Sequence, residues 1–134
     1  MNNIANLDPC REFKGILKDK QGIELGVIVL TYQSLVQVEL YYRKGGGSVI
    51  VGTIKTDQLC IGDIRMQKNN VGCGSIAMKA LLEFAKENSC SKVTGWLSPV
   101  DSGHFDRLEH FYKKFGFEVI FNENKTEGQI CLNL

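Results

Sequence analysis

The spacing of apolar residues changes character near residue 67. Before it, β-branched and aromatic residues cluster or alternate with polar ones, and this pattern predicts strands over 22–43, broken near 32–34, and over 49–54 and 59–66. The run Lys44 to Ser48, with three glycines, predicts a tight turn. Because these strands follow one another through short turns, the first half of the chain is expected to form an antiparallel meander.

After residue 71 the apolar residues recur every three or four positions. Six of them form one stripe that predicts an amphipathic helix, namely Ile76, Ala77, Ala80, Leu81, Phe84 and Ala85. A strand over 91–98, a loop over 99–103, a helix over 105–115 and strands over 117–121 and 128–134 complete the predicted order. Gly116 stands where a left-handed helix cap is typical.

This order of elements predicts one α+β domain over residues 1–134. Its sheet is mixed and mostly antiparallel. The helix between the strands at 59–66 and 91–98 is long enough for one parallel crossover, and parallel strands require such a crossover.

Composition narrows the class of protein. Hydrophobic residues make up 43% of the 134 residues, which supports a packed core. The net charge of +1 argues against a nucleic-acid binder that depends on a strong basic field. No apolar run has the length of a membrane span, the start of the chain does not resemble a secretory signal, and the five cysteines form no CxxC pair. We therefore expect a soluble, cytoplasmic protein without a disulfide framework or a metal site.

The segment Gly72-Cys73-Gly74-Ser75 is the strongest local signal for chemistry. It opens the predicted helix after a strand and a short polar connection, so its backbone N–H groups could hold a phosphate. Gly72-x-Gly74-x-x-Ala77 also matches a dinucleotide fingerprint, but no acidic residue ends the next strand to bind a ribose. A tight turn that only packs the helix on the sheet would have the same composition. The turn alone leaves these alternatives open.

A second stretch changes the balance between them. Asn69 to Gly74 resembles the Q/R-x-x-G-x-G/A motif of the GCN5-related N-acetyltransferase (GNAT) family, with Asn69 in place of the usual Gln or Arg. Forty residues later, Tyr112, Lys114, Gly116 and Phe117 resemble the family's C-terminal motif. The two motifs stand in the family's order, with one predicted strand between them.

The resemblance implies a fold and an activity. The fold is a mixed sheet that opens between its fourth and fifth strands, and the activity is direct transfer of an acetyl group from acetyl-CoA to an amine. Tyr112 is the implied general acid. Asp63 is the candidate general base, while Glu39 or a water molecule are alternatives. The implied contacts to acetyl-CoA are Ile64, Met66, Asn69, Asn70, Val71, Gly72, Cys73, Gly74, Ser75, His104 and Phe105, and within this set the backbone of Ile64 and Met66 would pair with the pantetheine arm.

The chain departs from the family's pattern at two places. Phe105 stands where many members carry an Asn, and no pair of helices is predicted between the first two strands, where the family's helices shape the acceptor site. A non-catalytic module that binds CoA or a protein on the same fold is therefore the alternative function. The acceptor stays open between a small amine and a peptide, and exposed strands in this half could pair in a homodimer.

Overall fold

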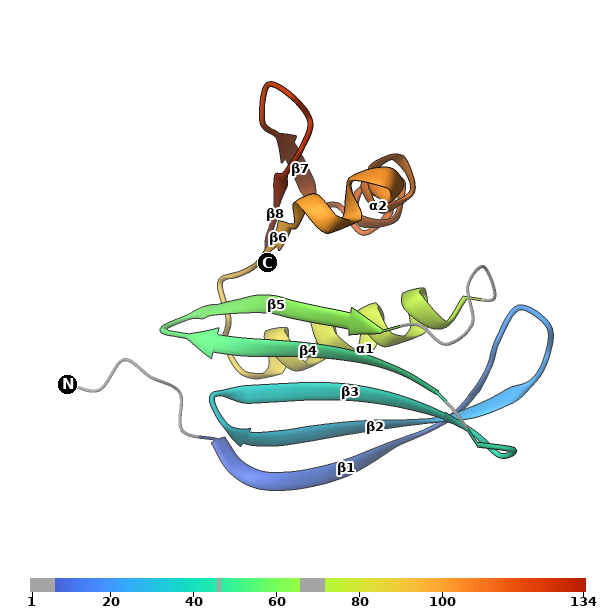
Figure 1. Cartoon of the computed structure of the whole chain (residues 1–134). Coiled ribbons are helices and arrows are strands. Elements are labelled where there is room, and N and C mark those ends of the chain that lie inside the picture. Colours follow the sequence, from blue (N-terminus) through green and yellow to red (C-terminus); the bar gives the residue numbers. More distant parts are fainter. Residues whose placement is uncertain (1–6, 46, 66–71) are drawn as a thin grey trace.

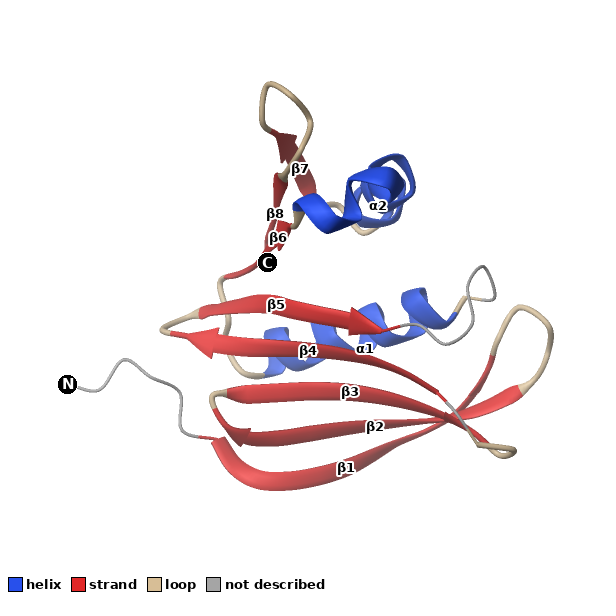
Figure 2. Cartoon of the chain, in the orientation of Figure 1, coloured by secondary structure: helices blue, strands red, loops and turns tan. Residues whose placement is uncertain are grey.

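The computed structural model describes residues 7–45, 47–65 and 72–134, and Figure 1 follows the chain through them. Figure 2 separates its helices from its strands. The elements are β1 (Leu7–Lys18), β2 (Glu24–Gln33), β3 (Leu35–Tyr42), β4 (Gly47–Lys55), β5 (Gln58–Arg65), α1 (Cys73–Glu87), β6 (Lys92–Leu97), the 3-10 helix η1 (Pro99–His104), α2 (Phe105–Lys114), β7 (Glu118–Phe121) and β8 (Gly128–Asn133).

All the strands belong to one sheet in the order β1-β2-β3-β4-β5-β6-β8-β7. The strands from β2 to β5 form the predicted antiparallel meander, and β1 adds an antiparallel edge strand to it. Strand β5 pairs with β6 in the parallel direction. The α1 crossover makes this parallel step possible. The predicted α+β class with a mixed sheet is confirmed.

Strand β1 was not predicted from the sequence. It pairs with β2, but its register shifts between Leu7 and Cys10 and again between Phe13 and Gly15, and such shifts interrupt the alternation of apolar and polar positions. It is also an edge strand on which Phe13, Ile16 and Leu17 are exposed, so the hydrophobic pattern does not report burial there. A tight turn joins β1 to β2, and the β2–β3 connection, where the sequence predicted no pair of helices, is also a tight turn.

The second half of the chain follows the prediction with one difference. Residues 99–104, expected as a loop through 103, form the 3-10 helix η1, which starts with Pro99 and is capped by the Ser98 side chain. Helix α2 ends as predicted. Gly116 has a φ of 92°, its N–H bonds to the carbonyl of Lys113, and the N–H of Phe117 bonds to the carbonyl of Tyr112. These two bonds form a Schellman cap.

The core lies on one face of the sheet. Leu59, Val93 and Leu132 stand opposite one another in register across β5, β6 and β8, and all three pack in the core with both helices. Their neighbours along each strand point to the other face, and Trp96 and Ile120 are exposed there. We call this second face the outer face. None of the helices in the described ranges is long and apolar enough to cross a membrane.

The sheet opens between β5 and β6. These strands are in register only from the pair Gln58–Lys92 to the pair Ile61–Gly95, and β5 then continues alone with β4 as neighbour. Figure 1 shows β6, β7 and β8 turned away from the first five strands. The two strands are those predicted to separate, and they become the fifth and sixth because β1 precedes the meander.

Candidate active site

A cleft of about 820 Å³ lies where β5 and β6 separate. Its walls come from the free end of β5, the first turn of α1, the end of β6 with η1 and one side of α2, and Lys20 of the β1–β2 turn and Ile130 of β8 complete them. Several residues that the sequence predicted for the site line this cleft, namely Asp63, Ile64, Gly72, Cys73, Gly74, Ser75, His104 and Tyr112. The fold thus brings together residues that lie up to 49 positions apart, from Asp63 to Tyr112.

The glycine turn begins α1 at the cleft. Gly72 is the N-cap and has a φ of 90°, a conformation that glycine adopts without strain. Its side-chain position is also occupied, since a Cβ there would stand 3.2 Å from Cγ of Lys20. No acidic residue lies in the first turn of α1, and no side chain caps it. The predicted contacts Met66, Asn69, Asn70 and Val71 lie outside the described residues.

A buried polar network holds the turn before β2 against the start of α1. Asp19 accepts hydrogen bonds from the backbone N–H groups of Gln21 and Ile23, at 2.9 and 3.0 Å, and from the Tyr42 hydroxyl at 2.8 Å. The same hydroxyl lies 3.0 Å from Sγ of Cys73. Burial and these two neighbours raise the pKa of Tyr42. Cys73 is therefore a structural contact as well as part of the cleft wall.

The free end of β5 supplies the long side of the cleft. Val51 pairs with Asp63 and Gly52 pairs with Ile61, so Gly62 is an extra residue that forms a bulge. Beyond Ile61 the side of β5 that faces β6 has no partner strand among the described residues. Unpaired backbone at such an edge can bind an extended ligand as a further strand would. Ile64 lies in this segment and lines the cleft.

Tyr112 reaches the cleft from α2. Its ring is 4% exposed and packs edge-on against Phe111 and Phe117, with centroids 5.3 and 5.4 Å away. The hydroxyl donates no hydrogen bond to a described residue, yet it is not sealed from solvent. Burial, together with the charge of Asp101, raises the pKa of Tyr112 to about 12. The hydroxyl therefore keeps its proton at neutral pH.

The two candidate bases lie on the outer face. Asp63 stands opposite Val51, at an outer-face position, and its carboxylate lies 2.7 Å from Nε of Arg65. Asp63 also borders the cleft, so it and Tyr112 approach the cleft from opposite faces of the sheet. Glu39 accepts a hydrogen bond from Gln37 at 2.5 Å on β3 and does not line the cleft.

The structure separates His104 from Phe105. His104 lines the cleft at the end of η1, whereas Phe105 is buried in the core with its ring 5.0 Å from that of Phe121. Phe105 is therefore not brought to the cleft. Cleft residues that sequence reasoning did not assign include Lys20, Trp96, Asp101 and Arg107. Arg107 begins the stretch that resembles the C-terminal motif, whereas the other three lie in no motif, and the fold brings all four to the cleft.

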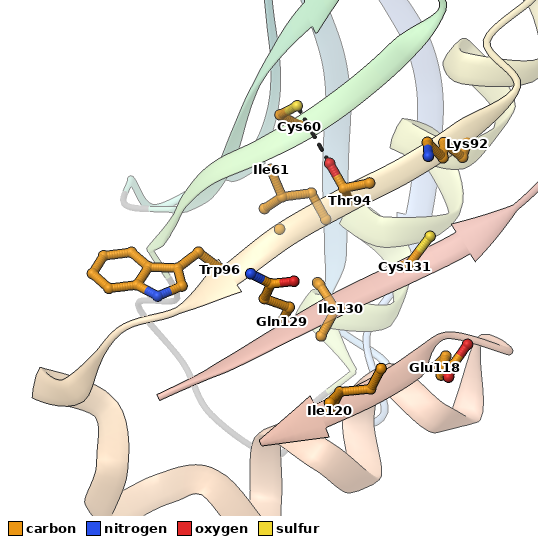
Figure 3. A pocket seen from close by; sticks show the side chains of 11 residues that line it. Cys60, Ile61, Lys92, Thr94, Trp96, Glu118, Ile120, Gln129, Ile130 and Cys131 are labelled. Carbon is orange, nitrogen blue, oxygen red and sulfur yellow. Dashed lines mark hydrogen bonds between the residues drawn. The ribbon is translucent and has the colours of Figure 1, made fainter. Parts of the chain in front are cut away.

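A hollow of about 510 Å³ lies on the outer face beside the cleft. Figure 3 shows Trp96, Gln129 and Ile120 along it, with a hydrogen bond from Thr94 to Sγ of Cys60 at 3.3 Å. It shares Ile61, Gly95, Trp96 and Ile130 with the cleft, so the two spaces meet at the point where the sheet opens. Within the described residues no group of three His, Cys, Asp or Glu side chains converges on a possible metal site.

Comparison with known sequences finds a relative but no family. No family model matches the chain. The uncharacterized protein YocC of Bacillus subtilis (strain 168) is 40% identical over 89 residues, which are 66% of this chain and 53% of YocC. The match thus spans about half the length of that curated relative.

Comparison with solved structures identifies the fold. The GNAT domain of S. lividans PAT superposes with a TM-score of 0.71 over 90% of this chain and 96% of that domain, at 6% identity. A Bacillus anthracis str. Ames protein assigned as a streptothricin acetyltransferase, in complex with acetyl coenzyme A, has a TM-score of 0.61 over 96% of this chain and 99% of its own, at 13% identity. An acetyltransferase from Bacillus cereus ATCC 14579 has a TM-score of 0.60, at 20% identity, over 75% and 73% of the two chains. These likenesses concern the fold alone.

Proposed function

From the premise that the chain has the GNAT fold, we propose that it is an acetyl-CoA-dependent N-acetyltransferase that acts on a primary amine of a small molecule or peptide. One observation carries the proposal. The glycine turn that starts α1 and the accessible hydroxyl of Tyr112 open onto the same cleft, at the point where β5 loses its neighbour strand. A phosphate site, a free strand edge and a proton donor are the parts that this reaction requires.

The cleft suits acetyl-CoA in three ways. Among the described residues no side chain caps the N-terminus of α1 and no acidic residue lies in its first turn, which favours a diphosphate at its N–H groups. The free edge of β5 at Gly62 to Arg65 could pair with the amide groups of pantetheine. The opening between β5 and β6 then connects the thioester end to the outer face. In this arrangement Met66, Asn69, Asn70 and Val71 would extend the contacts from β5 to α1.

The proposed reaction uses one proton donor and one acceptor. The neutral amine attacks the thioester carbonyl carbon, and a backbone N–H of β5 at Ile64 stabilises the oxyanion. When the carbon–sulfur bond breaks, Tyr112 donates its proton to the leaving thiolate. Its pKa of about 12 keeps it protonated for this step. Asp63, directly or through water, takes the proton that the amine loses, and it borders the cleft from the outer face, where the acceptor would enter.

The substitution Tyr112→Phe tests the proposal. It keeps the packed ring and removes the donor, so we expect kcat with acetyl-CoA and an amine acceptor to fall by about 100-fold or more while KM for acetyl-CoA changes little. The exposed Tyr32, changed to Phe, is the matched control. Acceptors can be found by following release of free CoA against panels of amines and peptides. Full activity in Tyr112→Phe would remove this residue from the mechanism.

The open outer face favours one alternative function. The β1–β2 connection is a short turn, so no helices between these strands cover the acceptor side, and exposed Trp96 and Ile120 remain there. A non-catalytic module that binds CoA and docks a protein on this face would have the same structure. Such a module would bind CoA in calorimetry but would show no turnover with any amine. An acetyltransferase would show turnover that depends on Tyr112.

A further inference from the structure

Positive charge collects at the start of α1 from two distant parts of the chain. Lys20 comes from the turn between β1 and β2, and Lys114 comes from the last turn of α2. Both line the cleft together with Gly72 and Ser75 of α1. The partial positive charge of a helix N-terminus lies at the same place.

Lys114 is held in position by three contacts. Its ammonium donates a hydrogen bond to Oγ of Ser75 at 2.7 Å, which links α2 to the first turn of α1. The same nitrogen lies 5.4 Å from the centroid of the Phe111 ring and 5.3 Å from that of Phe115. Cation–π contacts of this kind restrict a lysine side chain without neutralising its charge. The charge therefore stays available beside the helix N-terminus.

Lys20 approaches the same turn from the other side. Its Cγ, Cδ and Cε atoms lie 3.2 to 3.7 Å from the position that a Cβ of Gly72 would take, so the stem of the side chain crosses the glycine. The neighbouring Asp19 fixes the turn through two backbone N–H groups and through Tyr42, which also contacts Cys73. The network therefore connects the position of Lys20 to the start of α1.

The carboxylate described at this place, that of Asp19, accepts hydrogen bonds from the backbone N–H groups of Gln21 and Ile23 and from the Tyr42 hydroxyl. Neither lysine forms an ion pair with a residue in the described ranges, whereas the adjacent Lys113 pairs with Glu109 at 2.8 Å on the exposed side of α2. The first turn of α1 also lacks an acidic residue. Two lysines and a helix N-terminus repel one another in the free protein, and a bound anion with two or more charges would relieve that repulsion.

We propose that Lys20 and Lys114 bind the diphosphate of CoA from its two sides, over the backbone N–H groups of Gly72 to Ser75. This inference rests on the proposed function, since it names the side chains that hold the cosubstrate. The short β1–β2 turn thereby has a role on the cosubstrate side of the cleft. Lysine is suited to this role because its ammonium donates strong charge-assisted hydrogen bonds to phosphate oxygens.

The test compares ligands that differ in their phosphates. Lys20→Met and Lys114→Met keep most of the side-chain length and remove the charge. Calorimetry with the whole chain would measure Kd for CoA, for dephospho-CoA, which lacks the 3′-phosphate, and for ADP, while NMR titration would follow S-acetylpantetheine, which lacks the diphosphate. Each variant is expected to raise Kd for CoA and for dephospho-CoA by the same factor, roughly tenfold, and to make Kd for CoA less dependent on salt. Its Kd for S-acetylpantetheine should not change.

Matched controls separate this role from a general effect of charge. Lys18→Met and Lys113→Met remove exposed lysines near the two positions and outside the cleft lining, and they should leave Kd for CoA unchanged. Lys114→Arg should retain most of the affinity. A loss of affinity for CoA but not for dephospho-CoA would assign the lysines to the 3′-phosphate and overturn the proposal. An equal loss of affinity for S-acetylpantetheine, or no loss of affinity for any ligand, would also overturn it.

The outcome with the unmodified protein separates the two proposals. If it binds ADP in a manner that requires both lysines but does not bind CoA, the diphosphate site stands and the acetyltransferase function fails. If it binds CoA with no contribution from Lys20 and Lys114, the function stands and the lysine inference fails. Binding of neither ligand overturns both.

Discussion

At the residue scale, the side chain of Tyr112 both packs in the core and reaches the candidate active site. The ring completes an aromatic cluster with Phe111 and Phe117, while the hydroxyl remains accessible from the cleft. A tyrosine chosen for packing alone could be replaced by Phe, because the hydroxyl contributes no hydrogen bond to the described residues. A tyrosine with its ordinary pKa of 10.0 already keeps its proton at neutral pH, and burial of the ring within the α2 stripe raises this pKa further.

The raised pKa of Tyr112 predicts how stability depends on pH. The ordinary value is 10.0, and the folded value is about 12. Because the folded state binds this proton more tightly, the contribution to stability is complete below pH 10 and is lost as pH rises through 12. The loss amounts to about 2 to 3 kcal/mol over that window.

Urea denaturation from pH 9 to pH 11.5 measures this effect. The free energy of unfolding of the unmodified protein should fall more steeply with pH than that of Tyr112→Phe. Because Tyr42 also has a raised pKa and is present in both proteins, the difference between the two slopes isolates Tyr112. Parallel slopes would mean that the hydroxyl titrates as in the unfolded chain.

At the element scale, the start of α1 depends on a turn that comes more than fifty residues earlier. The Asp19–Tyr42–Cys73 network and the stem of Lys20 join the β1–β2 turn to the glycine turn. The β1–β2 turn has a local brace in Asp19, whereas the glycine turn has no side-chain cap of its own. The contact between elements replaces the local cap.

Removing the Tyr42 hydroxyl should loosen this junction. Tyr42→Phe deprives the buried Asp19 carboxylate of one donor, so we expect the free energy of unfolding to decrease by about 1 to 2 kcal/mol. Tyr41→Phe, at the neighbouring exposed position, should change it by less than about 0.5 kcal/mol. Chemical denaturation of both variants measures the difference. Equal effects would show that the network adds no stability.

A side chain at Gly72 should disturb both the turn and the lysine. Gly72→Ala places a Cβ on a residue with a φ of 90° and 3.2 Å from Lys20. We expect a loss of stability of about 1 to 2 kcal/mol and a weaker affinity for CoA. Gly103→Ala is the control, because its φ is not positive and nothing lies within 4 Å of its Cβ position. Thermal unfolding and CoA titration of both variants measure the two effects.

At the scale of the whole molecule, one face of the sheet carries the core and the other is open. Both helices pack on the same face, so the hydrophobic interior is confined to one side. The outer face keeps exposed apolar residues from β1 to β7, including Phe13, Trp96 and Ile120. Homodimer formation through exposed strands remains a prediction that this distribution leaves open.

Truncations on the two faces should therefore differ. Leu81, with an exposed fraction of 0%, lies between α1 and the sheet, and Leu81→Ala should lower the free energy of unfolding by about 2 to 5 kcal/mol. Ile120→Ala, at 59% exposure, should lower it by less than about 1 kcal/mol. Unfolding curves at two protein concentrations measure both. A large, concentration-dependent effect of Ile120→Ala would indicate that a second copy covers the outer face.

The sequence by itself determined the class of fold and most of the elements. The alternation over 22–43 and the stripe from Ile76 to Ala85 have a local physical cause, because each element must turn its apolar residues to one side. Gly116 predicted its cap for the same reason, since only a left-handed residue closes that helix end. The glycine turn could be identified from the sequence because glycine is the residue that adopts a positive φ without strain.

Only the tertiary structure decided which side chains meet there. Strand β1 escaped prediction because its bulges disrupt the alternation and its apolar residues face solvent. Lys20 and Lys114 belong to no common pattern, since they approach α1 from opposite ends of the chain. Phe105 and His104 are neighbours in sequence, yet one lies in the core and the other at the cleft. Local patterns record how each residue is buried, whereas the convergence of distant residues depends on how the sheet opens and how the helices pack on it.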